Sequence, residues 1–175
     1  MDSVAIERLR DKIARVHPGT PENFVTVDTT DQLLYLFNFA GPVGTFTIST
    51  SRFGIGNREG SFKTPLGMHR IVEKIGFGAP AGRIFRDRRD TGTDWHPGLT
   101  EENLILTRIL RLEGLEEGIN RGPGIDSFER CIYIHGTNKE SLIGTPFTHG
   151  CVCMSNVDII TLFETVEERA IVVIE

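Results

Sequence analysis

The chain has 175 residues, a length that fits one domain with a well-filled hydrophobic core. Its net charge of −5 argues against non-specific nucleic-acid binding, which needs a basic surface. No apolar run approaches the roughly 18 residues that a membrane helix requires. The three cysteines are an odd number, and Cys151 and Cys153 are too close for an ordinary bridge, so a disulfide framework is not expected.

The first residues, MDSVAIERLR, lack the basic and apolar regions of a secretory signal. We therefore expect a cytoplasmic protein, with a periplasmic location as the alternative if the sequence is a trimmed form of an exported protein. An amphipathic helix is predicted over residues 3–16 and is expected to pack on its own domain. The expected organisation is this helical segment, residues 1–19, and a second unit, residues 20–175. The apolar positions at helical spacing are Ile6, Leu9, Ile13 and Val16.

From residue 24 the apolar pattern is typical of β-strands. The segment FVTVDTTDQLLYLFNFAGPVGTFTIST predicts three short strands, separated by DTTDQ and FAGP. A glycine-rich loop, SRFGIGNREGSFKTPLG, leads to a further strand at MHRIVEKIG. The next segment, FGAPAGRIFRDRRDTGTDWHPG, is rich in turn-forming residues and is expected to form mostly turns. NLILTRILRLEG is short, rich in isoleucine and leucine and closed by glycine, which favours a strand over a helix.

RCIYIHG predicts a buried strand that ends at His135 and places Cys131 in the core. NVDIITLFETVEERA predicts a helix capped by Asn156, and IVVIE predicts a last strand. Many short strands with two or three helices predict a β-rich fold, either a sandwich or a barrel.

The chemistry is concentrated in THGCVCMSN, residues 148–156, and in the histidine of IYIHGTN. A cysteine attacks as thiolate, so Cys151 needs a neighbouring base, for which His135 is the candidate. The backbone carbonyl of Gly136 is the candidate acceptor for the other ring nitrogen. The amides of Gly150 and Cys151 are candidate donors to an oxyanion, with His149 lining the site. Together these groups predict an acyl-transfer site.

Other interpretations stay open for the same residues. Cys153 is also compatible with a small core residue. A zinc-stabilised binding module is the alternative of another class, because two histidines and two cysteines supply good zinc donors. The tight C-x-C spacing counts against it, and a C-x-C redox pair lacks its usual context. The zinc donors would be His135, His149, Cys151 and Cys153.

The segments HGT, residues 135–137, and THGC, residues 148–151, together resemble the signature of the L,D-transpeptidase (YkuD-type) catalytic domain family. KTPLGMHRI resembles a strand of that family, NVDIITLF the helix after its cysteine, and AIVVI its closing strand. The likeness runs from about residue 24 to residue 175.

This resemblance implies the β-rich fold of that family, with Cys151 as nucleophile, His135 as base and the Gly136 carbonyl as orienter. It implies cleavage of a peptidoglycan tetrapeptide stem between meso-diaminopimelate and the terminal D-alanine, through an acyl-thioester. An amine then resolves the thioester as a cross-link, or water resolves it as a carboxypeptidase would. No cofactor and no metal are implied, and the partners would be stem peptides or muropeptides.

The sequence departs from the family pattern at Cys153, where the family usually has an arginine. Other residues are then expected to bind the anionic substrate: Thr148, Arg83 and Arg108 first, with Arg58, Lys63, Arg86, Arg88 and Arg89 also considered. The lack of an export signal favours an L,D-carboxypeptidase in muropeptide recycling over an enzyme that forms cross-links in the cell envelope.

Overall fold

The computed structural model describes residues 3–16, 22–38 and 40–175, of which residues 3–5 are described by their backbone alone. The boundary predicted between residues 19 and 20 lies outside these ranges. Neither α-helix combines the length and the apolar character needed to cross a bilayer in the described part of the chain. The helices are α1 (Ser3–Val16), the 3-10 helix η1 (Glu140–Leu142) and α2 (Asn156–Thr165); the strands are β1 (Asn23–Asp28), β2 (Leu33–Asn38), β3 (Gly41–Thr47), β4 (Gly67–Ile75), β5 (Arg83–Arg86), β6 (Arg89–Asp94), β7 (Ile105–Gly114), β8 (Tyr133–Gly136), β9 (Val152–Met154) and β10 (Ile171–Ile174).

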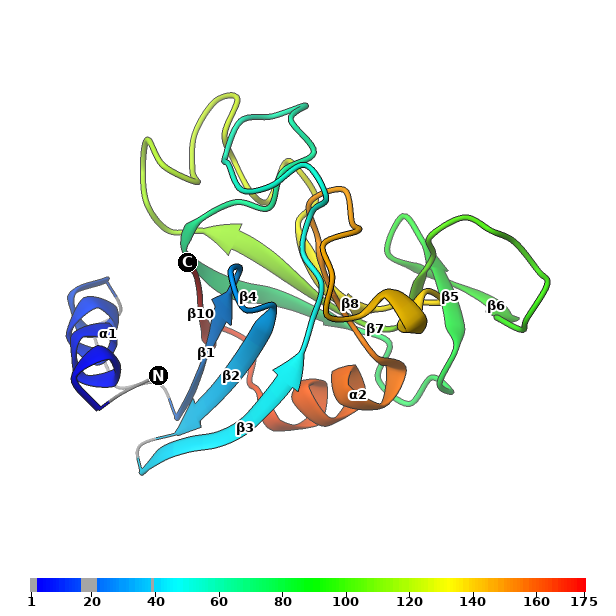
Figure 1. The fold of residues 1–175 in the computed structure, drawn as a ribbon, viewed down its shortest axis with the longest axis horizontal. Helices are drawn as coiled ribbons and strands as arrows, with labels where there is room; N and C mark the ends of the chain where they lie inside the picture. The colour runs from blue at the N-terminus through cyan, green and yellow to red at the C-terminus, as the bar shows by residue number, and fades with distance from the viewer. Residues whose placement is uncertain (1–2, 17–21, 39) are drawn as a thin grey trace.

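The strands form one sheet in the order β3-β2-β1-β10-β4-β7-β5-β6, and a branch of β8 and β9 leaves it at β7 (Figure 1). Two pairs are parallel, β1 with β10 and β8 with β9. The other pairs are antiparallel. The β-rich fold with two α-helices confirms the fold class predicted from the sequence.

The two faces of the sheet are covered by different helices. Because side chains alternate along a strand, Phe24 faces one side and Val25 the other. On the first side, Leu9 and Ile13 of α1 pack over a small cluster in which the rings of Phe24 and Phe37 stack at 4.9 Å. The larger cluster lies on the second side, under α2 (Figure 1). It includes Val25, Val27, Leu34, Leu110, Leu112, Ile134, Ile159, Leu162 and Phe163.

The segment expected to form mostly turns contains the hairpin β5–β6. Asp87 and Arg88 occupy its two-residue turn, with φ of 48° and 65°, the pattern of a type I′ turn. Ile84 and Phe85 are buried against β7, and this burial offsets the conformational entropy that is lost when the hairpin becomes ordered. The prediction of turns was therefore wrong here, because the tertiary contacts of two apolar residues outweigh the local turn propensity.

Two further local predictions need correction. Cys131 was expected in a buried strand, but it is exposed, with φ of 56°, and the strand begins only at Tyr133. The cap of α2 is Ser155, whose Oγ accepts a hydrogen bond from the Asp158 amide at 3.1 Å. Asn156 instead begins the helix, which leaves its side chain free to bind elsewhere.

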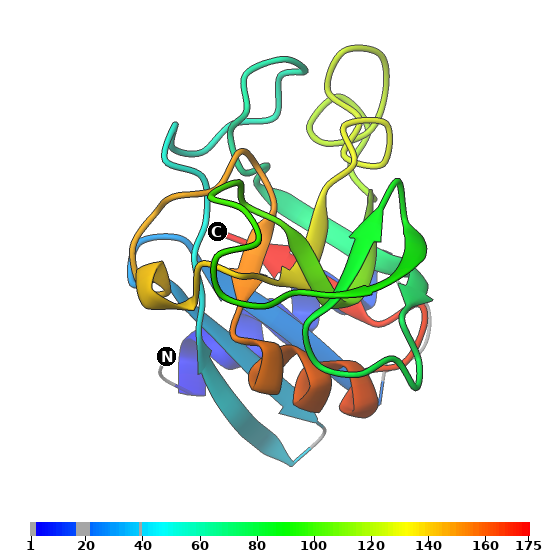
Figure 2. The same ribbon diagram turned by 90° about the vertical axis from the view of Figure 1, so that its right-hand side faces the viewer.

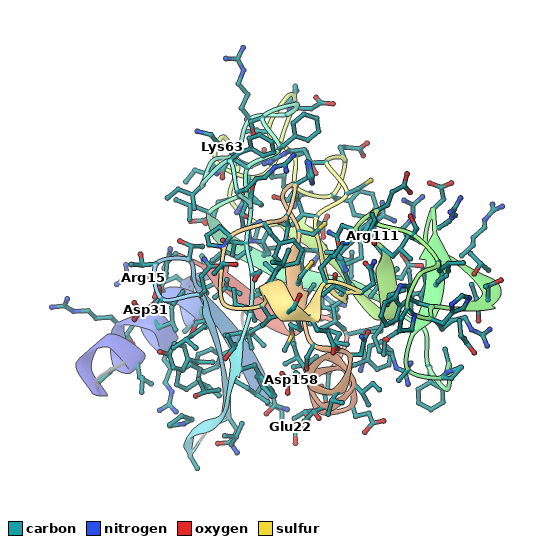
Figure 3. All side chains as sticks on the ribbon, turned by 45° about the vertical axis from the view of Figure 1, so that its right-hand side comes forward. Arg15, Glu22, Asp31, Lys63, Arg111 and Asp158 are labelled. Atoms are coloured by element: carbon teal, nitrogen blue, oxygen red, sulfur yellow. The ribbon has the colours of Figure 1, made fainter. Side chains whose placement is uncertain are left out.

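Two long loops, residues 51–66 and 115–131, rise together at the end of the molecule away from α2 (Figure 2). They are joined by hydrogen bonds, including Asn57 Nδ2 to the Ile119 carbonyl at 2.7 Å. Figure 3 shows the same separation, with Lys63 in the first loop far from Asp158 on α2. The loops therefore form one connected layer beside the branch that carries β8 and β9.

His69, on β4, attaches the second loop to the sheet. Its side chain is fully buried, with Nδ1 3.0 Å from the Gly67 carbonyl oxygen and Nε2 2.9 Å from the Ser127 hydroxyl. A carbonyl oxygen only accepts, so Nδ1 carries the proton and Nε2 accepts from Ser127. Burial lowers the pKa of His69 from 6.5 to about 4, so the imidazole is neutral in the folded protein at neutral pH.

His69 should make the protein less stable in weak acid. Its folded pKa lies below its ordinary value, so the unfolded chain binds more protons between the two values, and stability falls as pH falls through this window. The expected loss from this histidine is about 2 kcal/mol between about pH 7.5 and about pH 5. Urea unfolding at both pH values measures the loss, and His69→Gln, which does not titrate, should lose less. Equal losses in the two proteins would contradict the assignment.

Candidate active site

The parallel pairing of β8 with β9 brings the two sequence motifs together. The register places Ile134 opposite Val152 and His135 opposite Cys153. Cys151 directly precedes β9 and packs beside Ile109 and Tyr133, which lie on the same face of the sheet as His135. The histidine of one motif and both cysteines of the other therefore share one surface.

His135 is held by its own strand. Its Nδ1 lies 2.8 Å from the Gly136 carbonyl oxygen, the hydrogen bond that the sequence analysis expected. Because that oxygen only accepts, Nδ1 carries the proton and the lone pair of Nε2 is available to accept another. Burial lowers the pKa of His135 to about 4, against a smaller opposing effect of the Gly136 bond. The imidazole is therefore neutral at pH 7, as a general base must be.

The sulfur in contact with this imidazole belongs to Cys153. Its Sγ lies 3.6 Å from Nε2 of His135, and its side chain is fully buried. The Cys151 sulfur instead lies 3.5 Å from the carbonyl oxygen of Cys131 and packs beside Phe85, Ile109 and Tyr133. From the sequence, Cys153 was considered only as a small core residue, a zinc ligand or a member of a redox pair. The C-x-C spacing on a strand is the signal that indicates a shared face.

The Cys151 thiol is protonated in the resting protein. Burial raises its pKa to about 11, and this effect exceeds the lowering by a backbone hydrogen bond at Tyr133 and by the charge of Arg130. Burial likewise raises the pKa of the Cys153 thiol well above its ordinary value. The resting site therefore contains neutral thiols and a neutral imidazole.

The turn before the cysteine requires glycine. Gly150 has φ of 127°, and a Cβ at this position would lie 3.3 Å from Ile132 Cδ1 and 3.4 Å from the Lys63 carbonyl oxygen. Its amide donates to the Thr148 hydroxyl over a long 3.3 Å, and that hydroxyl donates to the Cys151 carbonyl at 2.6 Å. Thr148 is buried, so the residue predicted to bind substrate stabilises the turn in this structure.

His149 points toward the loop of residues 51–66. Its Nε2 is 2.9 Å from Arg52 Nη2, and its ring contacts Phe53 and Phe62 at centroid distances of 5.6 Å and 6.0 Å. His135 faces Cys153, so the four donors of the zinc alternative do not converge. Across the described residues, no group of three or more His, Cys, Asp or Glu side chains is placed to hold a metal ion.

The two arginines first considered for substrate binding have partners within the fold. Arg83 forms ion pairs with Asp90 at 3.0 Å and with Asp94 at 2.6 Å, which stabilise the β5–β6 hairpin. Arg108 is buried, and its Nη1 donates to the carbonyl oxygens of Ala79 and Thr107 at 2.7 Å and 2.6 Å. Neither contact points to a ligand.

Arg88 lies closer to the cluster around Cys151. Its Nη1 donates to the Tyr133 hydroxyl at 3.0 Å and is 3.9 Å from Cys131 Sγ. Of the basic residues considered from the sequence, this side chain is therefore the one with a contact to a neighbour of the nucleophile candidate.

One protein family matches this chain. The sequence profile of the L,D-transpeptidase catalytic domain (YkuD) matches residues 22–174. A search of curated proteins finds no match.

Several solved structures share the fold. An L,D-transpeptidase from Mycobacterium smegmatis has 11% identity and a TM-score of 0.53, over 89% of this chain and 59% of that chain. L,D-transpeptidase 3 from Mycobacterium tuberculosis has 12% identity and a TM-score of 0.56, over 89% and 61%. An Enterococcus faecium L,D-transpeptidase has 13% identity and a TM-score of 0.54, over 88% and 50%. The present chain thus spans between half and about three fifths of their lengths.

The neutral Cys151 thiol should react slowly with iodoacetamide at neutral pH. Only the thiolate is alkylated, so the rate should rise about tenfold per pH unit between about pH 7 and about pH 10. The exposed Cys131 is removed first as Cys131→Ser, and mass spectrometry of the Cys151 peptide follows the reaction. A rate that is already at its plateau at neutral pH would show a preformed thiolate and contradict the raised pKa.

Proposed function

This chain belongs to the L,D-transpeptidase catalytic domain family, and on that premise we propose that it transfers the acyl group of a peptidoglycan tetrapeptide stem through a thioester on Cys151. The bond cleaved is that between meso-diaminopimelate and the terminal D-alanine. Water is the proposed acceptor, which makes the reaction an L,D-carboxypeptidase step in muropeptide recycling, placed in the cytoplasm. Cross-link formation in the cell envelope is the alternative outcome of the same acyl-enzyme.

One observation supports the proposal above the others: the THGC turn enters a strand that pairs directly with the strand of His135. The neutral imidazole has its proton on Nδ1, bound to the Gly136 carbonyl, which leaves the lone pair of Nε2 available to act as a base. Cys151 is the half-buried thiol of the two, whereas Cys153 has no exposed surface. Of the two cysteines, Cys151 is therefore the one with surface open to an approaching substrate.

The reaction follows from these groups. As Sγ of Cys151 attacks the carbonyl carbon of the diaminopimelate residue, its proton passes to Nε2 of His135, and the carbonyl oxygen becomes an oxyanion. The Gly136 carbonyl, which accepts from Nδ1, stabilises the imidazolium that forms. Collapse of the intermediate expels D-alanine, whose amine takes the proton from Nε2, and leaves the thioester.

Water then resolves the thioester. His135 takes a proton from the water as its oxygen attacks the thioester carbonyl, and the Cys151 sulfur leaves and recovers a proton. The amides of Gly150 and Cys151 are the proposed oxyanion donors. The Gly150 amide is available because its resting hydrogen bond to Thr148 is long and is easily exchanged for a charged acceptor.

Cys151→Ala should abolish release of D-alanine from a disaccharide-tetrapeptide. Without the sulfur no thioester can form, so kcat/KM should fall at least about 1000-fold, and His135→Ala should be nearly as damaging. Chromatography of the released D-alanine measures the rate. Cys131→Ser is the matched control, because it removes an exposed thiol and should retain activity. Full activity in Cys151→Ala would end the proposal.

Product analysis separates the two outcomes. The enzyme is given tetrapeptide with and without an acceptor amine, and the products are weighed by mass spectrometry. Hydrolysis should yield the tripeptide and free D-alanine in both mixtures. Dimers, or exchange of D-alanine for an added D-amino acid, would show that transpeptidation is the reaction.

A further inference from the structure

We propose that Arg88 binds the terminal carboxylate of the tetrapeptide stem and thereby directs cleavage to free stem ends. The inference rests on the proposed function, which supplies the substrate. It assigns the anionic end of that substrate to one side chain of the β5–β6 hairpin, beside the proposed nucleophile.

The turn of the hairpin directs Arg88 toward the walls of the site. Arg88 has φ of 65° in this turn, and its side chain is half-buried. Its Nη1 donates to the Tyr133 hydroxyl at 3.0 Å and lies 3.9 Å from Cys131 Sγ. The Cys151 sulfur is 3.5 Å from the Cys131 carbonyl oxygen and packs in the same apolar cluster as Tyr133. Both residues that Arg88 contacts are therefore also neighbours of the proposed nucleophile.

The positive charge of Arg88 is not neutralised by the fold. A guanidinium stays protonated in proteins, and the groups it contacts here are a phenol and a thiol. Burial raises the pKa of Tyr133, which keeps that phenol neutral. None of the ion pairs among the described residues includes Arg88, and Asp87, beside it in the turn, acts on it only through its charge. A cation without an ion-pair partner next to a nucleophile attracts an anionic substrate group.

The guanidinium also has donors to spare. Both contacts of Arg88 use Nη1, so Nε and Nη2 are without a hydrogen-bond partner in the parts of the chain that the structure describes. These two donors form one edge of the guanidinium, which binds a carboxylate through two parallel hydrogen bonds. The bond to Tyr133 holds the group in place, so less side-chain entropy is lost when the carboxylate binds.

The terminal carboxylate is the substrate anion nearest to the reacting atoms. Only the nitrogen and Cα of D-alanine separate it from the carbonyl carbon that the Cys151 sulfur attacks, roughly 3–4 Å between the two carbons. Arg88 contacts two neighbours of that sulfur, so this carboxylate is the one within its reach. A stem whose D-alanine is amide-bonded in a cross-link lacks the charge, so the same contact favours free stem ends.

Other cations near the site are engaged by the fold. The charge of Arg130 acts on the nucleophile, but its Nη1 and Nη2 donate to the carbonyl oxygens of Gly56 and Lys63 at 3.2 Å and 2.5 Å. Arg52 contacts His149 at 2.9 Å. The arginine of the hairpin turn is therefore the one with free donors beside the proposed nucleophile.

A test without substrate uses two methanethiosulfonates of matched length, the anionic 2-carboxyethyl reagent and the cationic 2-aminoethyl reagent. In the disulfide that the first forms with Cys151, as many bonds separate the sulfur from the carboxylate as in the tetrahedral intermediate of the stem. The proteins are the parent, Arg88→Gln, Arg88→Lys and the exposed Arg89→Gln as a matched control from the same hairpin, each carrying Cys131→Ser. Mass spectrometry of the Cys151 peptide gives the ratio of the two rates.

Arg88→Gln should lower the ratio of the anionic to the cationic rate about tenfold, because the attraction of one reagent and the repulsion of the other are both lost. Arg88→Lys keeps the charge and should stay within about threefold of the parent. Arg89→Gln should leave the ratio unchanged. An unchanged ratio in Arg88→Gln, or an equal fall in Arg89→Gln, would overturn the proposal.

The kinetic readout compares a disaccharide-tetrapeptide that ends in D-alanine with one that ends in D-alaninamide. The wild type should prefer the free acid by at least about tenfold in kcat/KM, mainly through KM, and Arg88→Gln should lose this preference. If Arg88→Gln acts more slowly on both substrates and keeps the preference, Arg88 does not bind the terminal carboxylate and the proposal is wrong. Absence of D-alanine release by the wild type would refute the proposed function, whereas the ratio of the two reagents would still test Arg88.

Discussion

The site depends on one pairing: three residues of β8 against three residues of β9, in parallel and in one register. A shift of one residue would turn the side chains of β9 over and direct Val152 instead of Cys153 at His135. This pairing carries a histidine whose proton is fixed by its own strand, and it places the Cys153 sulfur against the histidine ring. The placement of the proposed nucleophile and of its proposed base follows from it.

Next to this pairing, the neighbouring strand β7 carries a bulge that is hydrogen-bonded to α2. Pairing of β7 with β8 shifts between Leu106 and Ile109, and within this bulge Thr107 adopts φ of 71°, which is costly for a β-branched residue. The Thr107 hydroxyl donates to Asn156, whose Nδ2 donates to the Thr137 carbonyl at 3.0 Å. The first residue of α2 thus secures the chain directly after Gly136.

Gly136 has a second requirement besides its carbonyl. A Cβ there would lie 2.5 Å from Asn156 Oδ1 and 2.8 Å from the Leu106 carbonyl oxygen, so no larger residue fits between the bulge and α2. The same close packing buries the side chains of the site away from solvent. Burial then keeps His135 unprotonated and raises the pKa of both thiols. Because the imidazole and the thiols are neutral in the resting protein, no reactive thiolate is present before a substrate binds.

Local sequence was sufficient for most elements of the fold. The strands from β1 to β4, the strand β7, the helix α2 and the last strand were each predicted from apolar spacing or β-branched content. The motif around Cys151 and the histidine of IYIHGTN identified the two chemical groups and the family. The hairpin β5–β6 and the exposure of Cys131 were missed, because both are decided by contacts with β7 and by the turn before β8.

The sequence by itself determined the candidate groups for the chemistry: a thiol after a glycine turn, a histidine at the end of a buried strand, and a carbonyl beside it. Only the tertiary structure decided which sulfur touches the imidazole and which arginines are already occupied by the fold. The physical reason is that register and ion pairing join residues far apart in the chain. The spacing of a motif does not encode them.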